Sequence, residues 1–424
     1  MTEIGKTMEE EIQTMTSRER VRAVLNHEIP DKMPIDFCAH RSSGIGAHGY
    51  NNLKRHLGYS EETTKVYDLM QQLAVPEDFL IERFGGDILQ VMLLKPSFGI
   101  REDKWKKVTL PSGDVSLVPE DFNPVINQDG DYEILDETGK CVAKRPKEGI
   151  YYDNVDFFLE GVESIEELNE KMRLPEITEE ELDFIENQAK YLYENTDKAL
   201  LCHVGCAVFE AGQQQFGYED FYYNLAAEPE LLHYWAEKLT DAYLVILDKM
   251  LGRIGKYIDV ALFGGDDLGT QISLQLSPDM YREMIKPYQK KLYQFVHRNY
   301  PEVKVGLHSC GAIKDIIPDL IDAGVDVLNP VQISAAGMEP EELKEKFGKD
   351  IVFWGGGADM QGYVNKCESP EDVYHHVYRL LEIFAPGGNY IFAPVHNILD
   401  NISPEKIIAI YQAAKDYREQ NPYT

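Results

Sequence analysis

The sequence is poor in positive charge, and this shortage excludes several classes of partner. It has 42 Lys and Arg against 73 Asp and Glu, which gives a formal net charge of −31. Proteins that bind nucleic acids normally show the opposite balance, and an anionic membrane surface repels an acidic protein for the same reason. We therefore expect neither a nucleic acid nor a membrane among its partners.

Cysteines and long apolar runs are also scarce. Six cysteines in 424 residues are too few for a disulfide-stabilised scaffold. No uninterrupted apolar run approaches the ~20 residues of a membrane span, and residues 1–16 lack the apolar core of a signal peptide. These absences predict a cytoplasmic protein whose cysteines are reduced.

Nucleotide-binding fingerprints are missing at the places where they are expected. No GxGxxG motif follows directly on a predicted strand, and no GxxxxGK[ST] motif occurs. The glycine runs at residues 264–265 and 355–357 follow predicted strands but lack the remaining residues of a phosphate loop. Nucleotide binding is therefore not supported.

The chain alternates between β-rich runs and amphipathic helices. The first helix is expected over residues 17–26, and helical segments over about 60–83. Strands are expected at eight places: 33–38, 86–93, 199–208, 259–264, 303–308, 325–331, 351–354 and 389–393. This alternation predicts an α/β protein with a TIM (β/α)8 barrel, and a doubly wound open sheet is the alternative.

Residues 97–160 interrupt the alternation. Turn signals at 111–114, 128–131 and 137–140 separate short alternating runs, a pattern typical of β-hairpins. We therefore expect a single barrel domain over residues 1–424. It would carry an N-terminal helical extension over residues 1–32 and a β-rich insertion over residues 97–160.

Ligand-type residues just past the strand ends are the functional candidates, because the chemistry of a barrel lies there. His308 and Cys310 stand one residue apart at the end of the fifth strand, and His396 follows the last strand. Imidazole and thiolate are preferred zinc ligands, and a catalytic zinc needs three protein ligands and an open position. The alternative is that His308 and Cys310 are merely packed at the start of a loop.

Acidic and amide side chains follow other strands. Asp266 and Asp267, after the fourth strand, are candidates for acid–base catalysis, for holding substrate or for orienting a histidine ligand. Their alternative role is to cap a helix or loop. Glu210, Asn329 and Gln332 are placed to line the same pocket.

Cys202 and Cys206 form a second pair of interest. They are four residues apart, so on a strand they face the same side. Buried core packing is the usual role of free cysteines, and a thiolate pair is the alternative. Cys206 is kept as a candidate for the substrate pocket.

Several segments resemble the uroporphyrinogen decarboxylase superfamily. Among them are FGGDILQV, FWGGGADMQ and the stretches at residues 18–37, 264–288, 305–332 and 387–414. The resemblance extends over roughly residues 17–420 and implies a TIM barrel. It also divides into two branches with different functions.

In the first branch, true uroporphyrinogen decarboxylases bind an octacarboxylate without a metal, through an arginine-rich loop and an aspartate. Asp87 looks similar to that aspartate, but the loop here reads FCAHRSSGIGAHGY, with Arg41 alone. The net charge of −31 likewise gives no sign of a site for a polyanion. The resemblance to this branch is therefore the weaker one.

In the second branch, zinc-dependent methyltransferases exchange methyl groups with a corrinoid protein. Their zinc motif is His-x-Cys followed by a distant cysteine. His308 and Cys310 match the first part, and His396 stands where the distant cysteine falls. The resemblance thus implies zinc on His308, Cys310 and His396, and a methyl-corrinoid carried by a partner protein.

The function expected from this resemblance is methyl transfer between a methylated small molecule and the corrinoid protein. A methoxylated aromatic compound that undergoes O-demethylation is the preferred donor. One alternative is a metal-free decarboxylase with Asp87 at its centre, and another is a non-catalytic barrel that binds a corrinoid protein. A homo-oligomer is compatible with each of these functions.

Overall fold

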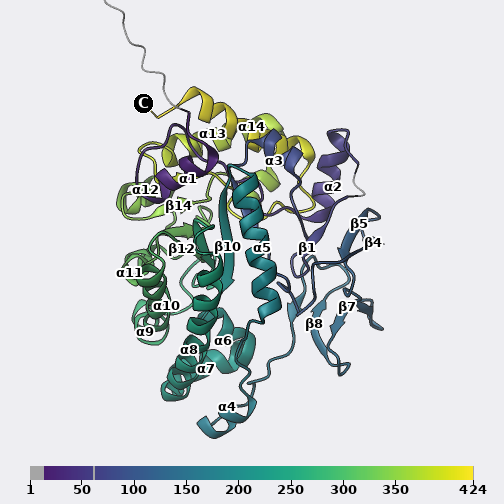
Figure 1. Cartoon of the computed structure of the whole chain (residues 1–424), viewed down its shortest axis with the longest axis vertical. Coiled ribbons are helices and arrows are strands. Elements are labelled where there is room, and N and C mark those ends of the chain that lie inside the picture. Colours follow the sequence, from purple (N-terminus) through teal and green to yellow (C-terminus); the bar gives the residue numbers. More distant parts are fainter. Residues whose placement is uncertain (1–13, 61–62, 424) are drawn as a thin grey trace, which may run out of the picture.

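The structure is a computed structural model that describes residues 14–60 and 63–423. Residues 1–13 of the expected N-terminal extension lie outside the described residues. A seven-stranded parallel sheet curls through the centre of the chain (Figure 1). Its order is β15 (Tyr390–Ile391), β14 (Val352–Trp354), β13 (Val327–Asn329), β12 (Lys304–His308), β11 (Val260–Phe263), β10 (Ala199–Gly205) and β3 (Ile88–Val91).

An extended segment at residues 33–37 joins the two edges of this sheet. Ile35 forms a parallel bridge with Phe392, and the Asp36 N–H donates to the Phe392 carbonyl at 2.8 Å. On the other side, the Asp87 N–H donates to the Ile35 carbonyl at 2.7 Å, directly before β3. The prediction of a TIM-like α/β fold is confirmed, although the first expected strand consists of one bridged residue.

Helices cover the outside of the sheet (Figure 1). Strand β11 is buried along its whole length, as expected for a parallel sheet whose two faces are both covered. The outer helices are α1 (Ser17–Leu25), α5 (Glu179–Asn195), α8 (Pro229–Ile254), α9 (Pro278–Met284), α10 (Lys286–Asn299), α11 (Ile317–Ala323), α12 (Pro340–Phe347), α13 (Pro370–Phe384) and α14 (Pro404–Gln420).

Three of these helices begin with the same local signal. Ser277, Ser369 and Ser403 each accept a backbone N–H from the first turn, and proline occupies the first helical position of α9, α13 and α14. The serine oxygen accepts a backbone N–H that has no partner within the helix. Proline suits the first helical position because it lacks the N–H that would have no acceptor there. Short polar residues before an apolar stripe therefore fix where these helices start. No helix within residues 14–60 and 63–423 combines the length and the apolar character of a membrane span.

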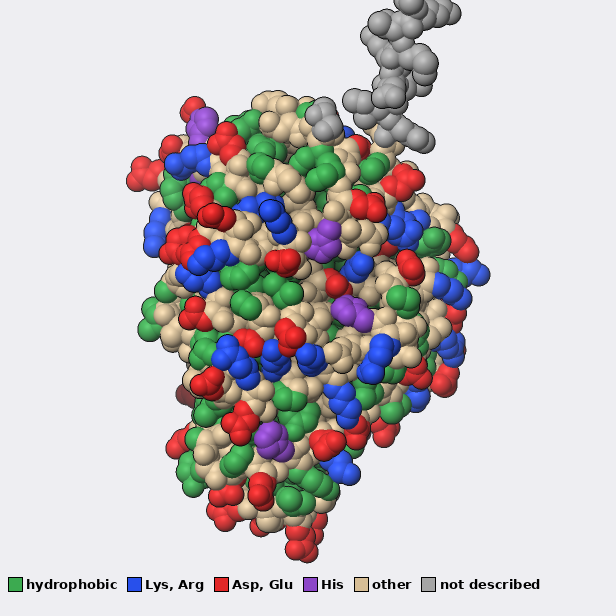
Figure 2. Space-filling model, turned by 90° about the vertical axis from the view of Figure 1, so that its left-hand side faces the viewer, with side chains coloured by type: hydrophobic (Ala, Val, Ile, Leu, Met, Phe, Trp, Pro, Cys, Tyr) green, Lys and Arg blue, Asp and Glu red, His purple; other side chains and the backbone are tan. Residues whose placement is uncertain are grey.

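The face made by α9 to α12 carries acidic and basic side chains side by side (Figure 2). Arg282 and Lys286 form ion pairs with Asp319 at 2.9 and 2.8 Å, and Lys290 pairs with Asp322 at 2.9 Å. These pairs tie α9 and α10 to α11. The surplus of acidic residues is therefore partly neutralised on this side of the barrel.

The segment between the first two barrel strands differs from its prediction. Helix α2 (Ala47–His56) was not expected, and residues 66–74 form an antiparallel pair, β1 (Val66–Asp68) with β2 (Leu73–Ala74), instead of a helix. Only α3 (Asp78–Phe84) confirms the helical part of the prediction over 60–83. Strand β1 is buried at every position. Val66 and Tyr67 are therefore buried as parts of a strand and not as the apolar face of a helix.

The start of α2 also explains a glycine string. Residues 44–49 match GxGxxG, but they follow a loop, and the Asp400 carboxylate already accepts the Gly49 N–H at 2.9 Å. A Cβ at Gly46 would lie 2.2 Å from the same carboxylate. The Asp400 carboxylate therefore occupies the start of α2, and no room is left there for a phosphate.

The β-rich insertion contains two antiparallel sheets beside the barrel (Figure 1). The turn signals at 111–114, 128–131 and 137–140 each join two antiparallel strands. The strands are β4 (Trp105–Thr109), β5 (Val115–Pro119), β6 (Val125–Ile126), β7 (Tyr132–Leu135), β8 (Cys141–Arg145) and β9 (Asp153–Asn154). Helix α4 (Ile165–Lys171) leads back to the barrel, and α6 (Phe209–Phe216) and α7 (Tyr218–Ala227) follow β10.

Candidate metal centre

The carboxyl ends of the barrel strands surround a cavity of about 410 Å³. Its wall combines residues that follow barrel strands with residues from the β1–β2 turn and from the end of the insertion. They are His40, Arg41, Ser42, Met70, Gln71, Tyr151, Tyr152, Asp153, His203, Glu210, Gln214, Leu262, Gly265, Asp267, His308 and His396. This is the end of the barrel at which enzymes of this fold carry their active sites.

Three potential metal ligands meet at this cavity, of which His308 and His396 line the wall and Cys310 lies next to them. His308 ends β12, Cys310 lies in the loop after it, and His396 follows β15; their donor atoms all lie within 4.8 Å of one another. The His308 Nε2 is 3.5 Å from the Cys310 Sγ. A tetrahedral zinc ion holds its nitrogen and sulfur donors about 3.3–3.8 Å apart. The His308 and Cys310 donors are therefore at the spacing that zinc requires, and the His396 donor lies within 4.8 Å of both.

Asn329 fixes the ring of His308. The His308 Nδ1–H donates to the Asn329 Oδ1 at 3.0 Å, and the Asn329 amide nitrogen donates to the Trp354 carbonyl at 3.0 Å. The second bond determines which atom of the amide is the oxygen, so the Nδ1 must carry the proton. The Nε2 lone pair is then free on the side of Cys310. Histidines that bind metals commonly donate their other ring N–H to an acceptor in this way. Asn329 was expected to line the pocket and instead stands behind a ligand.

Asp267 lies against the same centre. Its carboxylate accepts the Cys310 N–H at 2.8 Å and lies 3.6 Å from the His308 Nε2. It therefore steadies the loop of one ligand and faces the other. Of the two acids predicted after the fourth strand, Asp267 is the one that reaches the cavity.

The charge states of the three ligands fit a metal site. Burial lowers the pKa of His396 to about 4, and burial also lowers the pKa of His308, so both imidazoles are neutral at neutral pH. Burial and the Asp267 carboxylate raise the pKa of the Cys310 thiol well above its usual range. A metal must displace that proton, as it does at other thiolate sites.

Asp266 points away from the cavity. Its buried carboxylate accepts the N–H groups of Val208, Phe209 and Glu210 at 3.1, 2.8 and 3.0 Å, and the side-chain amide of Gln289 at 2.7 Å. It thus caps the start of α6. The structure supports the helix-cap alternative for Asp266 and not the catalytic role.

Gln332 and Cys206 also lie outside the cavity wall. The Gln332 Oε1 accepts the Gly311 N–H at 2.7 Å, so this residue supports the loop that carries Cys310. Cys206 is buried, and its thiol donates to the Val204 carbonyl at 3.3 Å. The expectation that these two residues contact substrate is not matched by their positions.

Asp87 lies at the opposite end of the barrel. It directly precedes β3, and its carboxylate pairs with Arg20 at 2.8 Å and with Arg418 at 3.1 Å. It also accepts the Ser17 hydroxyl at 2.8 Å and the Ile35 N–H at 2.9 Å. Every part of this buried carboxylate is occupied by the protein. A catalytic role at the cavity is therefore inconsistent with its position.

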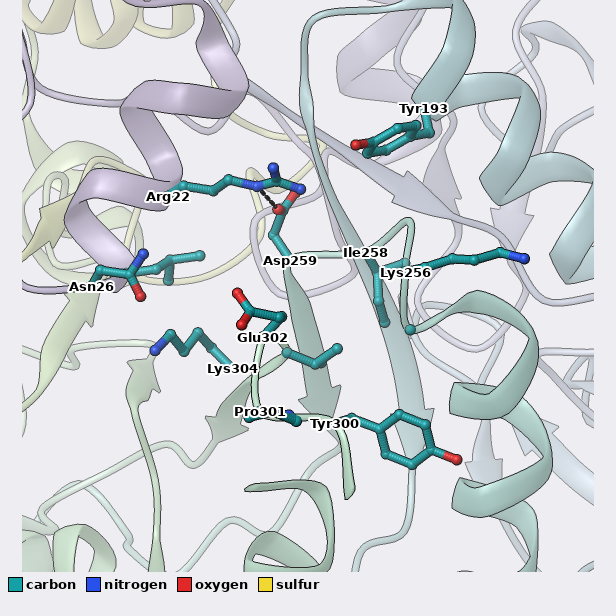
Figure 3. Close-up of a pocket in the computed structure, with 13 residues that line it drawn as sticks. Arg22, Asn26, Tyr193, Lys256, Ile258, Asp259, Tyr300, Pro301, Glu302 and Lys304 are labelled. Carbon is teal, nitrogen blue, oxygen red and sulfur yellow. Dashed lines mark hydrogen bonds and ion pairs between the residues drawn. The ribbon is translucent and has the colours of Figure 1, made fainter. Parts of the chain in front are cut away.

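A second cavity, of about 470 Å³, opens at this amino end of the barrel (Figure 3). Arg22 from α1 reaches across to Asp259, with the Arg22 Nε 2.5 Å from the Asp259 carboxylate. Asp259 also accepts the Leu200 N–H at 2.8 Å. The buried acid of this pocket is therefore committed to the fold, and we place the chemistry at the carboxyl end.

Several residues of the wall were not predicted. Met70, Gln71, Tyr151 and Asp153 come from the β1–β2 turn and from the insertion, and no motif in the sequence marks them. His203 sits on β10, within the strand-end stretch 202–206 from which only the cysteines were singled out. Burial lowers the pKa of His203 well below its usual range, so it is neutral.

Fold and site together define a TIM-like α/β barrel protein with three potential metal ligands clustered at the carboxyl ends of its strands. The uroporphyrinogen decarboxylase (URO-D) family model matches residues 161–417, and the chain belongs to this family. No curated protein matches the chain.

Among solved structures, a methyltransferase from Methanosarcina mazei is similar over 95% of this chain and 99% of that chain, with a TM-score of 0.55 and 16% identity. This likeness shows a common fold. The xylanase XynB from Paenibacillus barcinonensis matches over 56% of this chain and 83% of its own, with a TM-score of 0.33 and 10% identity.

Proposed function

We propose that this protein is a zinc-dependent methyltransferase that moves a methyl group between a methylated small molecule and a corrinoid protein. The observation that carries the proposal is the cluster of His308, Cys310 and His396 at the barrel mouth. Membership of the URO-D family and the shared fold of a methyltransferase support it.

Zinc, when bound, supplies Lewis acidity to the oxygen or sulfur that carries the methyl group. The protein contributes the rest of the site. Asn329 keeps the His308 Nδ1 protonated and its Nε2 available, and Asp267 holds the Cys310 loop in place. A donor set with one thiolate and two imidazoles donates less charge than a thiolate-rich set, which favours Lewis acidity and hence a methyl ether as donor.

The cavity suits a methoxylated aromatic compound, the donor that we prefer. Its volume of about 410 Å³ lies within the range of small-molecule sites, and Tyr151, Tyr152, Met70 and Leu262 supply apolar surface in the same wall as His308 and His396. The corrinoid protein must approach the methyl carbon from the open mouth. Against a chain with a net charge of −31, a partner with a basic rim has the more favourable encounter.

The two alternatives lack such support. A porphyrinogen decarboxylase needs Asp87 at the site, and Asp87 lies at the other end of the barrel. Arg41 is the one Lys or Arg among the described residues of the wall, and it is paired with Asp68 at 2.5 Å. A non-catalytic barrel is less well supported, because three protein ligands beside an open cavity are typical of a catalytic zinc site.

The test is a metal analysis followed by a screen of methyl donors. We expect near-equimolar zinc in the purified protein, and methyl-cobalt(III) formation from cobalt(I) corrinoid and at least one aryl methyl ether. Chelation should abolish the transfer and zinc should restore it. Absence of zinc, or no methyl-cobalt from any donor, would refute the proposal, and decarboxylation insensitive to chelators would favour the metal-free alternative.

Asn329→Leu should weaken zinc binding while leaving the three ligands in place. The change keeps the size of the side chain but removes the acceptor of the His308 Nδ1–H. Loss of such an outer partner costs about 10–100-fold in metal affinity. Competition with a chromophoric chelator measures it, and Asn299→Ala on the exposed end of α10 should leave the affinity unchanged. Equal affinities for wild type and Asn329→Leu would contradict the role of Asn329.

A further inference from the structure

Glu210 is a carboxyl group in the cavity wall that the metal centre does not use. It occupies the first turn of α6, directly after β10, and lines the cavity together with Asp267 and His308. It does not belong to the group of donor atoms that lie within 4.8 Å of one another. Glu210 therefore lines the cavity without being one of the three potential metal ligands.

The position of Glu210 is built by its surroundings. The buried Asp266 carboxylate accepts the Glu210 N–H at 3.0 Å and two neighbouring amides, which anchors the start of α6. Gly265 leaves the space that the side chain fills, because a Cβ there would lie 1.9 Å from the Glu210 Oε2. A buried aspartate and a glycine thus hold this carboxyl at the wall.

The charges around Glu210 favour its protonated form. Burial, followed by the Asp267 and Asp266 carboxylates, raises the pKa of Glu210 to about 8, while Arg41 opposes the rise. Gln214 donates a hydrogen bond from the next turn of α6.

Tyr218 on α7 and Tyr243 on α8 lie near Glu210. Burial raises the pKa of both phenols, and the Glu210 carboxylate adds a smaller contribution in the same direction. Both are therefore uncharged around neutral pH and leave Glu210 protonated. A bound dication would pull the pKa of Glu210 back toward neutrality, where a general acid is most effective.

We propose that Glu210 is the general acid that protonates the leaving oxygen of the methyl donor. The inference rests on the proposed function, because it takes a methyl ether and cobalt(I) on the partner protein as reactants. The cobalt(I) electron pair forms the bond to the methyl carbon, and the carbon–oxygen pair moves to oxygen. Glu210 gives its proton to that oxygen and becomes a carboxylate. The products are an alcohol or phenol and methyl-cobalt(III).

A comparison of two donors tests this role. Glu210→Gln keeps the size and polarity of the side chain but cannot give up a proton. We expect it to slow transfer from an unactivated aryl methyl ether by about 10²–10⁴-fold. Transfer from a nitro-substituted aryl methyl ether, whose phenolate leaves without a proton, should fall less than about tenfold. Zinc content should be unchanged, and Glu219→Gln, on the exposed start of α7, should behave as wild type.

Two further measurements separate proton donation from a structural effect. The wild-type rate with the unactivated ether should fall as the pH rises through the pKa of Glu210, because the acid form is lost, and Glu210→Gln should lack this fall. Infrared difference spectra of the zinc-loaded protein at neutral pH should show the C=O stretch of a protonated carboxyl that Glu210→Gln removes. This second readout does not depend on turnover.

Three results would overturn the assignment. They are an equal loss with both donors, an unchanged rate with the unactivated ether, and the absence of the carboxyl band. Failure of the proposed function has a different signature: the wild-type protein then transfers methyl from neither donor, and the inference falls with it.

Discussion

Cys310→Ala is expected to lose its bound zinc and its methyl transfer together. Cys310 is the one ligand of the three that becomes an anion on binding, and its sulfur already lies 3.5 Å from the His308 Nε2. Without it, two neutral imidazoles remain, which is fewer ligands than a catalytic zinc site normally has. Since loss of an outer partner alone costs 10–100-fold, loss of this ligand should lower the affinity by more than about 100-fold.

Metal analysis of the purified variants measures this loss directly. Substitution with cobalt(II) adds a spectroscopic check, because a thiolate-to-cobalt absorption should appear in the wild type and be missing from Cys310→Ala. Cys367→Ala is the matched control, since Cys367 precedes α13, does not line the cavity, and donates its thiol to the Ser369 carbonyl. Near-equimolar zinc in Cys310→Ala would remove the basis of the proposed function.

His396→Ala distinguishes a ligand from a mere wall residue. His396 stands where the zinc methyltransferases that the chain resembles have a cysteine. The sequence motif therefore supports His396 as a ligand less strongly than it supports His308 and Cys310. The ring centroids of His308 and His396 are 5.9 Å apart, and the donor atoms are closer. A His396→Ala protein that binds zinc as tightly as wild type would leave the centre with two protein ligands.

Much of the barrel could be predicted from local chemistry. Apolar runs such as residues 260–263 are buried on both faces, so they stand out from the helices around them. Serine and proline mark the first turns of three outer helices. The first strand is the exception in the opposite sense: a strand was expected over residues 33–38, but only Ile35 forms a bridge to the sheet.

The segment from residue 47 to residue 74 could not be predicted from such patterns. Helix α2 begins without a side-chain cap, and the carboxylate that accepts the Gly49 N–H comes from Asp400, at the other end of the sequence. Strand β1 is buried against the insertion, and β2 contributes Ala74 to the main core, so a local window does not contain the partners of either strand. Tertiary contacts override propensity at both places.

The ligand triad followed from topology, whereas its surroundings did not. Parallel strands end at one edge, so His308 and His396 could be expected to meet although the sequence separates them widely. The roles of Asp266 and Asp267 differ although they are neighbours, because adjacent residues in a loop point in different directions. Asn329 supports a ligand because its strand pairs with β12, and this contact depends on the register of the sheet.

Asp87→Ala should destabilise the protein strongly and leave zinc binding intact. The change removes a carboxylate partner from two buried guanidinium groups. Arg20 keeps Asp31 at 2.7 Å, whereas Arg418 keeps the Gly85 carbonyl at 3.1 Å and, as its carboxylate, the exposed Glu419 at 3.7 Å. Breaking a buried pair in this way costs about 3–5 kcal/mol. The midpoint of urea unfolding measures the loss, and zinc content of the folded protein should match the wild type.

A second substitution decides between a structural and a catalytic Asp87. Arg418→Met in the Asp87→Ala background removes the stranded charge and should recover part of the lost stability. Asp241→Ala, which breaks an exposed pair with Lys291, should cost only about 0–1 kcal/mol. A catalytic Asp87 predicts the reverse pattern, namely an inactive protein of nearly unchanged stability that Arg418→Met does not improve. The ion pairs of Asp87 at the amino end of the barrel make the first pattern the expected one, because the contacts of this carboxylate are internal to the fold.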